Sequence, residues 1–244
     1  QEAGLLILGA QGHGMLEGVP GLAKTTAVAC LAKAIRTGFQ RLQFTPDLLP
    51  ADLIGTLIYR PQDQQFVVQK GPIFSNLILA DEINRASPKT QSALLQAMQE
   101  HHVTVAGQRH DVPAPFHVLA TQNPLEQEGT YPLPEAQLDR FLLQIDINYP
   151  DQAAERRMLF ATTGTEERRV ETIITAPELQ TIQRLVRQLP VPDKVVETIL
   201  QLVRSARPGT GAGGDTDRLV AWGPGPRASQ ALMLATRAKA LLDG

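Results

Sequence analysis

The segment from Gly14 to Ile35 constrains the fold most strongly. It begins with the short apolar run GMLEG, passes through the loop VPGLA and continues into the helical pattern KTTAVACLAKAI. A strand, a glycine-containing loop and a helix that starts with Lys-Thr are typical of a phosphate-binding loop. Ala23 departs from the strict pattern G-x-x-x-x-G-K-[ST], which has glycine there. Alanine predicts a negative φ, because glycine is needed only where φ is positive or the backbone must approach closely.

The residue types of this loop suit a nucleoside triphosphate. Gly18 and Gly21 are candidates for the turn, Lys24 for contact with the β and γ phosphate oxygens, and Thr25 for a magnesium ligand. The alternative is a glycine-rich turn between a strand and a helix that binds no ligand. The predicted nucleotide contacts are Gly18, Val19, Pro20, Gly21, Leu22, Ala23, Lys24, Thr25 and Thr26.

The first 150 residues alternate between strand-like and helical patterns. This alternation predicts the α/β class, with a parallel sheet between two helical layers and strands buried on both faces. Helical patterns cover Lys24–Ile35 and Pro88–Glu100. The strand-like runs are Gly14–Gly18, Arg41–Phe44, Leu77–Asp81, Phe116–Asn123 and Phe141–Ile147.

Two segments interrupt the alternation in the manner of hairpins. One pairs Leu57–Tyr59 with Phe66–Gln69 around a polar turn, and the other covers His102–Val112. The first residues of the sequence, QEAGLLILGAQ, look like the end of a helix. Whether residues upstream of them help to form a pocket for a nucleotide base is left open.

Strand signals stop after the sequence NYPD at residues 148–151. We therefore predict a nucleotide-binding core over residues 1–150 and a small helical lid domain over residues 151–244. A Gly-rich run at 207–217 predicts a mobile surface loop. The helical patterns of the second part are Gln152–Thr162, Pro177–Gln188, Pro192–Ala206 and Arg227–Leu242.

The run LILADEINRA delivers two adjacent carboxylates, Asp81 and Glu82, at the end of an apolar strand. Magnesium-dependent hydrolysis of a nucleoside triphosphate uses one carboxylate to orient the hydrated metal and another to polarise the attacking water. The alternative is a solvated helix start, in which Ser87 and Pro88 form the cap and first position of the next helix. The preceding phosphate loop favours the catalytic interpretation.

Three further polar residues follow predicted elements. Asn123 ends the strand of FHVLATQNP, at the sheet edge where ligands of α/β sheets gather, although asparagine before proline also starts turns. Arg140 ends a helix in EAQLDRF and either acts in a neighbouring subunit or pairs with Asp139 or Glu135. Arg227 lies in the first turn of a helix, where the dipole disfavours a cation and an anionic partner would compensate.

Taken together, these motifs resemble the MoxR family of AAA+ ATPases. The family's order of motifs is matched by GVPGLAKT, LADEINRA, ATQNP, EGTYPLPEAQLDRF and a late PRA, so the resemblance covers nearly the whole chain. It implies an αβα core with a helical lid, ATP or ADP with Mg²⁺ in the cleft between them, and a homo-oligomeric ring, commonly a hexamer. The two hairpins are similar to the pre-sensor hairpin and the insert of the helix-2-insert clade, which face the ring pore and contact clients.

The resemblance also implies roles for individual residues. Lys24 and Thr25 correspond to the Walker A loop, Asp81 and Glu82 to Walker B, and Asn123 to sensor 1. Arg140 is similar to the arginine finger and Arg227 to the sensor 2 arginine, although the late motif reads GPGPRA where the family more often has serine before the proline. A client with a von Willebrand factor A domain is a further implication, and nothing in the sequence identifies it.

Composition limits other functions. The net charge of -2 and the sequence pI of about 6.2 disfavour bulk binding to nucleic acid or an anionic membrane. No apolar run approaches the length of a membrane span, and the single cysteine, Cys30, agrees with a reducing compartment, so we predict a cytoplasmic protein. The histidines lack metal-ligand spacing, and we expect surface roles for them; they are His13, His101, His102, His110 and His117.

The sequence thus predicts an ATP hydrolase that remodels or assembles a protein partner. One alternative is a related motor, either a metal-chelatase subunit or a DNA-associated helicase. The other is a nucleotide-binding scaffold that hydrolyses little and acts as a regulated interaction module.

Overall fold

The computed structural model describes residues 2–18, 24–123, 129–163, 170–209 and 215–244. The chain forms two compact units. Unit 1 comprises Gln1–Gly14, Leu133–Leu143 and Pro177–Gly244, and unit 2 comprises Met15–Pro132 and Gln144–Ala176. The predicted boundary after residue 150 stays a prediction. Among the helices of the described ranges, none combines the length and apolar character that a membrane crossing requires.

A five-stranded sheet organises unit 2. Its order is β2-β5-β8-β1-β9, and the pairs β2–β5 and β5–β8 are parallel. The α/β class is therefore confirmed. The strands are β1 (Gly14–Gly18), β2 (Phe39–Gln43), β5 (Leu77–Asp81), β8 (His117–Gln122) and β9 (Leu143–Ile147).

Burial of the strands follows their position in the sheet. The central strands β5 and β8 are buried along almost their whole length, as their apolar sequences predicted. The expectation that every strand is buried on both faces was wrong for the edge strands β2 and β9, in which several residues are exposed. Both strands lie at an edge of the sheet, with a neighbouring strand on one side only. In β2, for example, the polar residue Arg41 is exposed.

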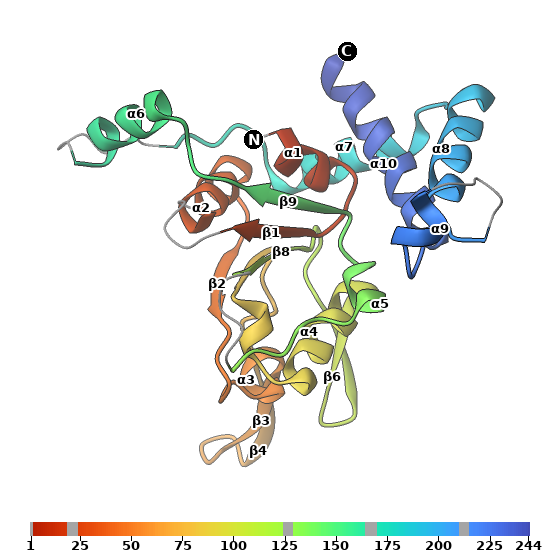
Figure 1. Cartoon of the computed structure of the whole chain (residues 1–244). Coiled ribbons are helices and arrows are strands. Elements are labelled where there is room, and N and C mark those ends of the chain that lie inside the picture. Colours follow the sequence, from red (N-terminus) through yellow and green to blue (C-terminus); the bar gives the residue numbers. More distant parts are fainter. Residues whose placement is uncertain (1, 19–23, 124–128, 164–169, 210–214) are drawn as a thin grey trace. The chain divides into compact units, whose positions relative to one another are not determined.

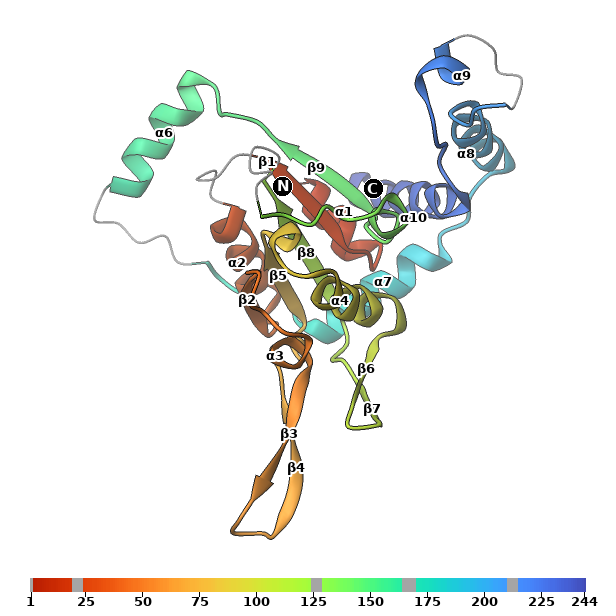
Figure 2. The same cartoon turned by 60° about the horizontal axis from the view of Figure 1, so that its bottom comes forward.

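Two helices cover opposite faces of the sheet, as Figure 2 shows. They are α2 (Lys24–Ile35) and α4 (Pro88–Glu100). The crossover from β1 through α2 to β2 and the crossover from β5 through α4 to β8 run in opposite directions across the sheet. Because such crossovers are right-handed, their helices must lie on opposite faces. The unit 2 core lies between these layers and includes Val28, Ile78, Leu79, Leu94, Leu95 and Val118.

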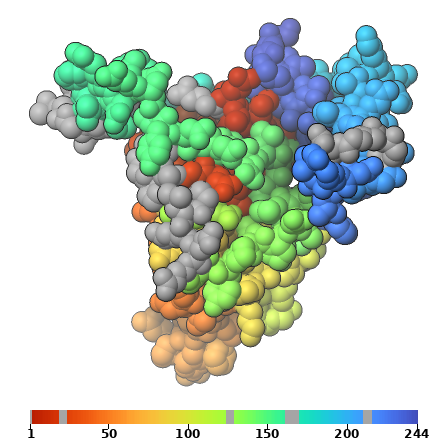
Figure 3. Space-filling model, in the orientation of Figure 1, coloured from red at the N-terminus to blue at the C-terminus, as the bar shows by residue number. Residues whose placement is uncertain are grey.

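Both predicted hairpins are present and project from the same end of unit 2 (Figures 1 and 2). The first joins β3 (Gly55–Arg60) to β4 (Gln65–Lys70), and the second joins β6 (His102–Val105) to β7 (Gln108–Asp111). The exposed rings of Tyr59 and Phe66 face each other across the first hairpin with centroids 5.2 Å apart. Its outer end forms the orange projection in Figure 3.

The remaining helix of unit 2 is α6 (Gln152–Thr163), preceded along the chain by the short elements α3 (Pro50–Ile54) and η1 (Ile83–Arg85). Unit 1 is helical and contains α1 (Glu2–Gly9), α5 (Glu135–Leu138), α7 (Ala176–Gln188), α8 (Asp193–Ser205), α9 (Asp215–Leu219) and α10 (Pro226–Asp243). Its core joins α1, α7 and α10 through buried Ala10, Val186 and Ala238.

The structure corrects two expectations about these segments. Residues 215–217 belong to α9, so the Gly-rich run is not a single loop up to residue 217. His13 and His117 are buried, in contrast to the surface role expected for them. His117 begins a central strand whose neighbours exclude water, and spacing alone did not indicate this.

Candidate functional site

Three neighbouring strands bring polar side chains together at their carboxyl ends. Gln43 on β2 pairs with Asp81 on β5, and Ala80 pairs with Ala120, which places Thr121 beside Asp81 in the next row. Residues in one row of a parallel sheet share a face. Gln43, Asp81 and Thr121 therefore form a polar row, as expected of a ligand site on an α/β sheet.

Asp81 is held from two sides. Thr121 Oγ1 donates a hydrogen bond to Asp81 Oδ1 over 2.5 Å, and the Arg41 guanidinium donates to Oδ2 from Nη2 over 2.6 Å and from Nε over 3.1 Å. Thr121 is buried, whereas half of the Arg41 side chain is exposed. The first contact is thus sheltered from solvent, and the second lies at the protein surface.

Glu82 points to different partners, although it follows Asp81 directly. Its φ of 55° and ψ of 51° are left-handed, which is uncommon for a residue with a Cβ. Its Oε2 accepts hydrogen bonds from Gln43 Nε2 over 2.9 Å and from Arg85 Nη1 over 3.0 Å. The two adjacent carboxylates therefore make separate contacts, which suits two different chemical roles.

Lys24 opens α2 and lies near both acids. Its Nζ donates to the carbonyl oxygen of Gly18 over 2.6 Å. Burial lowers the pKa of the Lys24 ammonium, and the negative charges of Asp81, Glu82 and Glu17 partly offset this effect. An ammonium and two carboxylates within electrostatic reach of each other provide the charges that a phosphate and a divalent cation require.

The rest of the predicted phosphate loop is placed only in part. Gly18 ends β1, where a Cβ would lie 2.5 Å from the carbonyl oxygen of Ile147, so no other residue fits. Thr25 is half-buried and Thr26 is exposed in the first turn of α2. Val19, Pro20, Gly21, Leu22 and Ala23 lie outside the described residues, and so does the predicted φ of Ala23.

Asn123 is buried immediately after the end of β8, on the strand that also carries Thr121. The structure thus gathers Lys24, Asp81, Glu82 and Asn123 around the ends of adjacent elements of unit 2. Their functional roles stay predictions.

Arg140 and Arg227 belong to unit 1. Arg140 follows α5 and is half-buried, and Arg227 is exposed in the first turn of α10. A Cβ at Gly225, the N-cap of α10, would lie 3.7 Å from Asp139 Oδ2. The residue before Arg140 therefore adjoins the start of the helix that carries Arg227.

Sequence reasoning missed four residues around the acids: Arg41, Gln43, Arg85 and Thr121. Arg41 and Gln43 alternate with apolar residues in RLQF, which was a signal for one polar face. Thr121 is a polar residue near the end of an apolar strand. Neither signal identifies a partner, because the contacts depend on the order and register of three strands.

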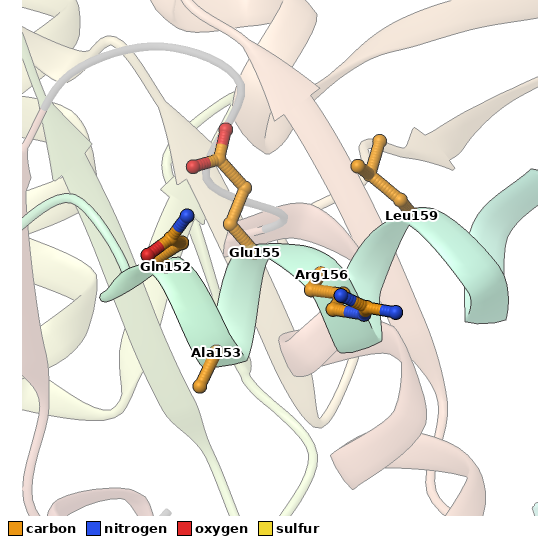
Figure 4. Close-up of a pocket in the computed structure, with 5 residues that line it drawn as sticks. All are labelled: Gln152, Ala153, Glu155, Arg156 and Leu159. Carbon is orange, nitrogen blue, oxygen red and sulfur yellow. The ribbon is translucent and has the colours of Figure 1, made fainter.

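A hollow along α6 does not form a comparable site. Figure 4 shows that its lining side chains all come from this one helix and point to different sides of it. The described ranges also contain no group of three or more His, Cys, Asp or Glu side chains placed to hold a metal by themselves. Mg²⁺ ordinarily completes its coordination with water and substrate oxygens beside one or two carboxylates.

Comparisons with known proteins identify the family of the chain. Residues 13–143 match the model of the ATPase family associated with various cellular activities (AAA). Chaperone MoxR1 of Mycobacterium tuberculosis is 44% identical over 96% of this chain and 62% of its own length. Protein MoxR of Methylorubrum extorquens is 32% identical over 96% of this chain and 73% of its own.

The fold is similar to that of a solved protein as well. A crystal structure of a candidate ATPase from Cytophaga hutchinsonii has a TM-score of 0.89 and 42% identity, and the match covers 99% of this chain and 74% of that one. The chain spans less than two thirds of MoxR1. The motifs, the sheet and the relatives together lead to one family: the chain belongs to the MoxR family of AAA+ ATPases.

Proposed function

We propose that the chain binds ATP with Mg²⁺ and hydrolyses it to ADP and phosphate, and that hydrolysis drives remodelling or assembly of a protein partner. One observation carries the proposal. Asp81 and Glu82 leave the end of β5 toward separate partners, with the Lys24 ammonium within electrostatic reach of both. Membership of an ATPase family supports the same reaction.

The donor set fits Mg²⁺. The Asp81 carboxylate and the Thr25 hydroxyl are oxygen donors, which this cation prefers, and it commonly takes one or two carboxylates together with phosphate oxygens. When bound, Mg²⁺ neutralises charge that develops on the phosphate oxygens. We assign Thr25 and Asp81 to this cation.

The other residues act on the nucleotide and on water. Lys24 and the backbone N–H groups of residues 18–26, with the exception of Pro20, which has none, hold the phosphates. The Glu82 carboxylate accepts a hydrogen bond from the attacking water, and Asn123 orients the same water. Arg140 contacts the γ-phosphate in a neighbouring subunit of a ring, commonly a hexamer, and Arg227 contacts the nucleotide from the lid domain at residues 151–244.

The partner is assigned by class only. The relative from M. tuberculosis bears the name chaperone, which supports a role on other proteins. We propose a protein client, one with a von Willebrand factor A domain, and a cytoplasmic location. The slightly negative net charge supports a protein client over nucleic acid.

A Glu82→Gln substitution tests the catalytic assignment. Glutamine keeps an oxygen that accepts hydrogen bonds from Gln43 and Arg85 but lacks the negative charge that polarises water. We expect turnover to fall at least about a hundredfold while ATP affinity stays within about threefold.

Phosphate release and binding of a fluorescent ATP analogue measure the two effects. Glu100→Gln, which changes an exposed carboxylate at the end of α4, is the control and should leave both unchanged. Equal losses of binding and turnover in Glu82→Gln would show that the residue is misassigned.

A further inference from the structure

Thr121 stands out in unit 2 because one buried hydroxyl contacts both acidic residues. Its Oγ1 donates to Asp81 Oδ1 over 2.5 Å and accepts the backbone N–H of Glu82 over 2.9 Å. It is almost fully buried, with 2% of its surface exposed.

The direction of these hydrogen bonds follows from their chemistry. The Glu82 backbone N–H can only donate, so it must use a lone pair of the Thr121 oxygen. The single hydroxyl proton of Thr121 is then directed to the Asp81 carboxylate, which can only accept when ionised. Thr121 is thereby locked in one orientation, and the two acids are connected through it.

The hydrogen bond between Thr121 and Glu82 stabilises an unfavourable backbone conformation of Glu82. Glu82 lies in the left-handed region, which costs free energy for a residue with a Cβ. The Glu82 N–H donates to the hydroxyl of the buried Thr121 in a partly buried hydrogen bond, and the Glu82 carbonyl oxygen accepts from the Arg85 N–H over 2.9 Å. This conformation separates the direction of the Glu82 side chain from that of Asp81.

The two side chains that contact the Asp81 carboxylate, Thr121 and Arg41, differ in their exposure to solvent. Thr121 occupies Oδ1 from the interior of the sheet, whereas Arg41 reaches Oδ2 from an exposed edge strand. The Arg41 contact is a surface ion pair, which contributes little stability, whereas the Thr121 contact is partly buried and less exposed to water. Thr121 therefore fixes the carboxylate, and the Oδ2 side stays accessible to a cation.

We propose that Thr121 is a positioning residue, which aligns the Asp81 carboxylate for the divalent cation and holds Glu82 in the conformation that presents its carboxylate to water. This inference rests on the proposed function. Thr121 acts through its contacts to the two acids.

The test compares Thr121→Val with Thr121→Ser. Valine is similar in shape but lacks the hydroxyl, and serine keeps it. Thr90→Val is the matched control, because Thr90 is also fully buried in unit 2 and donates its hydroxyl to the Leu48 carbonyl oxygen, away from the acids. Thermal unfolding of all variants checks that each folds.

Three measurements follow: Mn²⁺ binding to the ADP complex by electron paramagnetic resonance, steady-state ATP hydrolysis, and hydrogen exchange of the Glu82 amide. For Thr121→Val we expect Mn²⁺ affinity and kcat to fall about tenfold or more, with KM for ATP within about threefold. The Glu82 amide should exchange at least about tenfold faster, because it loses its acceptor. Thr121→Ser should restore all three values to within about threefold of wild type, and Thr90→Val should change none of them.

The outcomes separate the two proposals. Wild-type Mn²⁺ affinity and kcat in Thr121→Val, or a defect in Thr121→Ser as large as that in Thr121→Val, would overturn the positioning role alone. A wild-type chain that binds no Mn²⁺ with ADP and releases no phosphate would overturn the proposed function and the catalytic part of this inference with it. In that case, amide exchange would still report whether Thr121 holds Glu82.

Discussion

Arg41 contacts the same carboxylate that we assign to Mg²⁺. Its guanidinium donates two hydrogen bonds to Asp81 Oδ2 and a third, over 3.1 Å, to Gln43 Oε1. Two cations that share one carboxylate oppose each other's binding. Because the Arg41 side chain is half exposed, the expected opposition is modest.

An Arg41→Ala substitution should strengthen Mn²⁺ binding to the ADP complex about two- to fivefold, which corresponds to the upper range for a surface ion pair. Isothermal titration of Mn²⁺ measures this change. Arg109→Ala is the control, since Arg109 forms an exposed pair with Asp111 on the β6–β7 hairpin. Weaker Mn²⁺ binding in Arg41→Ala would show that Arg41 assists the cation instead.

The residues that sequence could predict differ from those that only structure shows. Lys24, Asp81 and Asn123 each belong to a short motif whose residue types indicate their chemistry. Arg41 and Thr121 lie about 40 residues before and after Asp81 and meet it only because β2 and β8 flank β5. That adjacency comes from strand order, which no local pattern contains.

At the scale of elements, α4 shows why some boundaries are predictable. Ser87 is its N-cap and accepts the Thr90 N–H over 3.4 Å, Pro88 occupies its first turn, and His101 ends it in the left-handed conformation. The bounds Pro88–Glu100 match the sequence prediction. The five-residue helices α3 and α9 were missed, because they are too short for a helical period to emerge.

A Ser87→Ala substitution should lower the free energy of unfolding by about 1 kcal/mol, the usual cost of losing a polar N-cap. Urea denaturation measures the effect. Ser92→Ala, in the exposed middle of the same helix, is the matched control and should be neutral or slightly stabilising, because alanine has the higher helix propensity. Equal effects at both positions would contradict the capping role of Ser87.

At the scale of the whole molecule, the proposed reaction draws on residues beyond unit 2. Arg140 and Arg227 lie in unit 1, one after α5 and one at the start of α10. An arginine supplied by a neighbouring subunit increases phosphoryl transfer roughly a thousandfold or more. If Arg140 acts in this way, activity depends on assembly and each active site is shared.

Mixing wild-type subunits with Arg140→Ala subunits tests the shared site. The specific activity of the mixture should fall more steeply than the fraction of wild-type chains, because each mutant subunit also disables its neighbour. Mixtures with Arg184→Ala, an exposed arginine on α7 of the same unit, should follow the wild type. A decline that is simply proportional to the mutant fraction would argue for sites that are complete within one chain.

Phosphate release from ATP, measured over a wide range of concentrations of the wild-type chain with Mg²⁺ present, tests the central claim most directly. We predict Mg²⁺-dependent release whose rate per chain rises with protein concentration as subunits assemble, and which Glu82→Gln abolishes. Absence of Mg²⁺-dependent phosphate release at every concentration would contradict ATP hydrolysis and favour a nucleotide-binding scaffold.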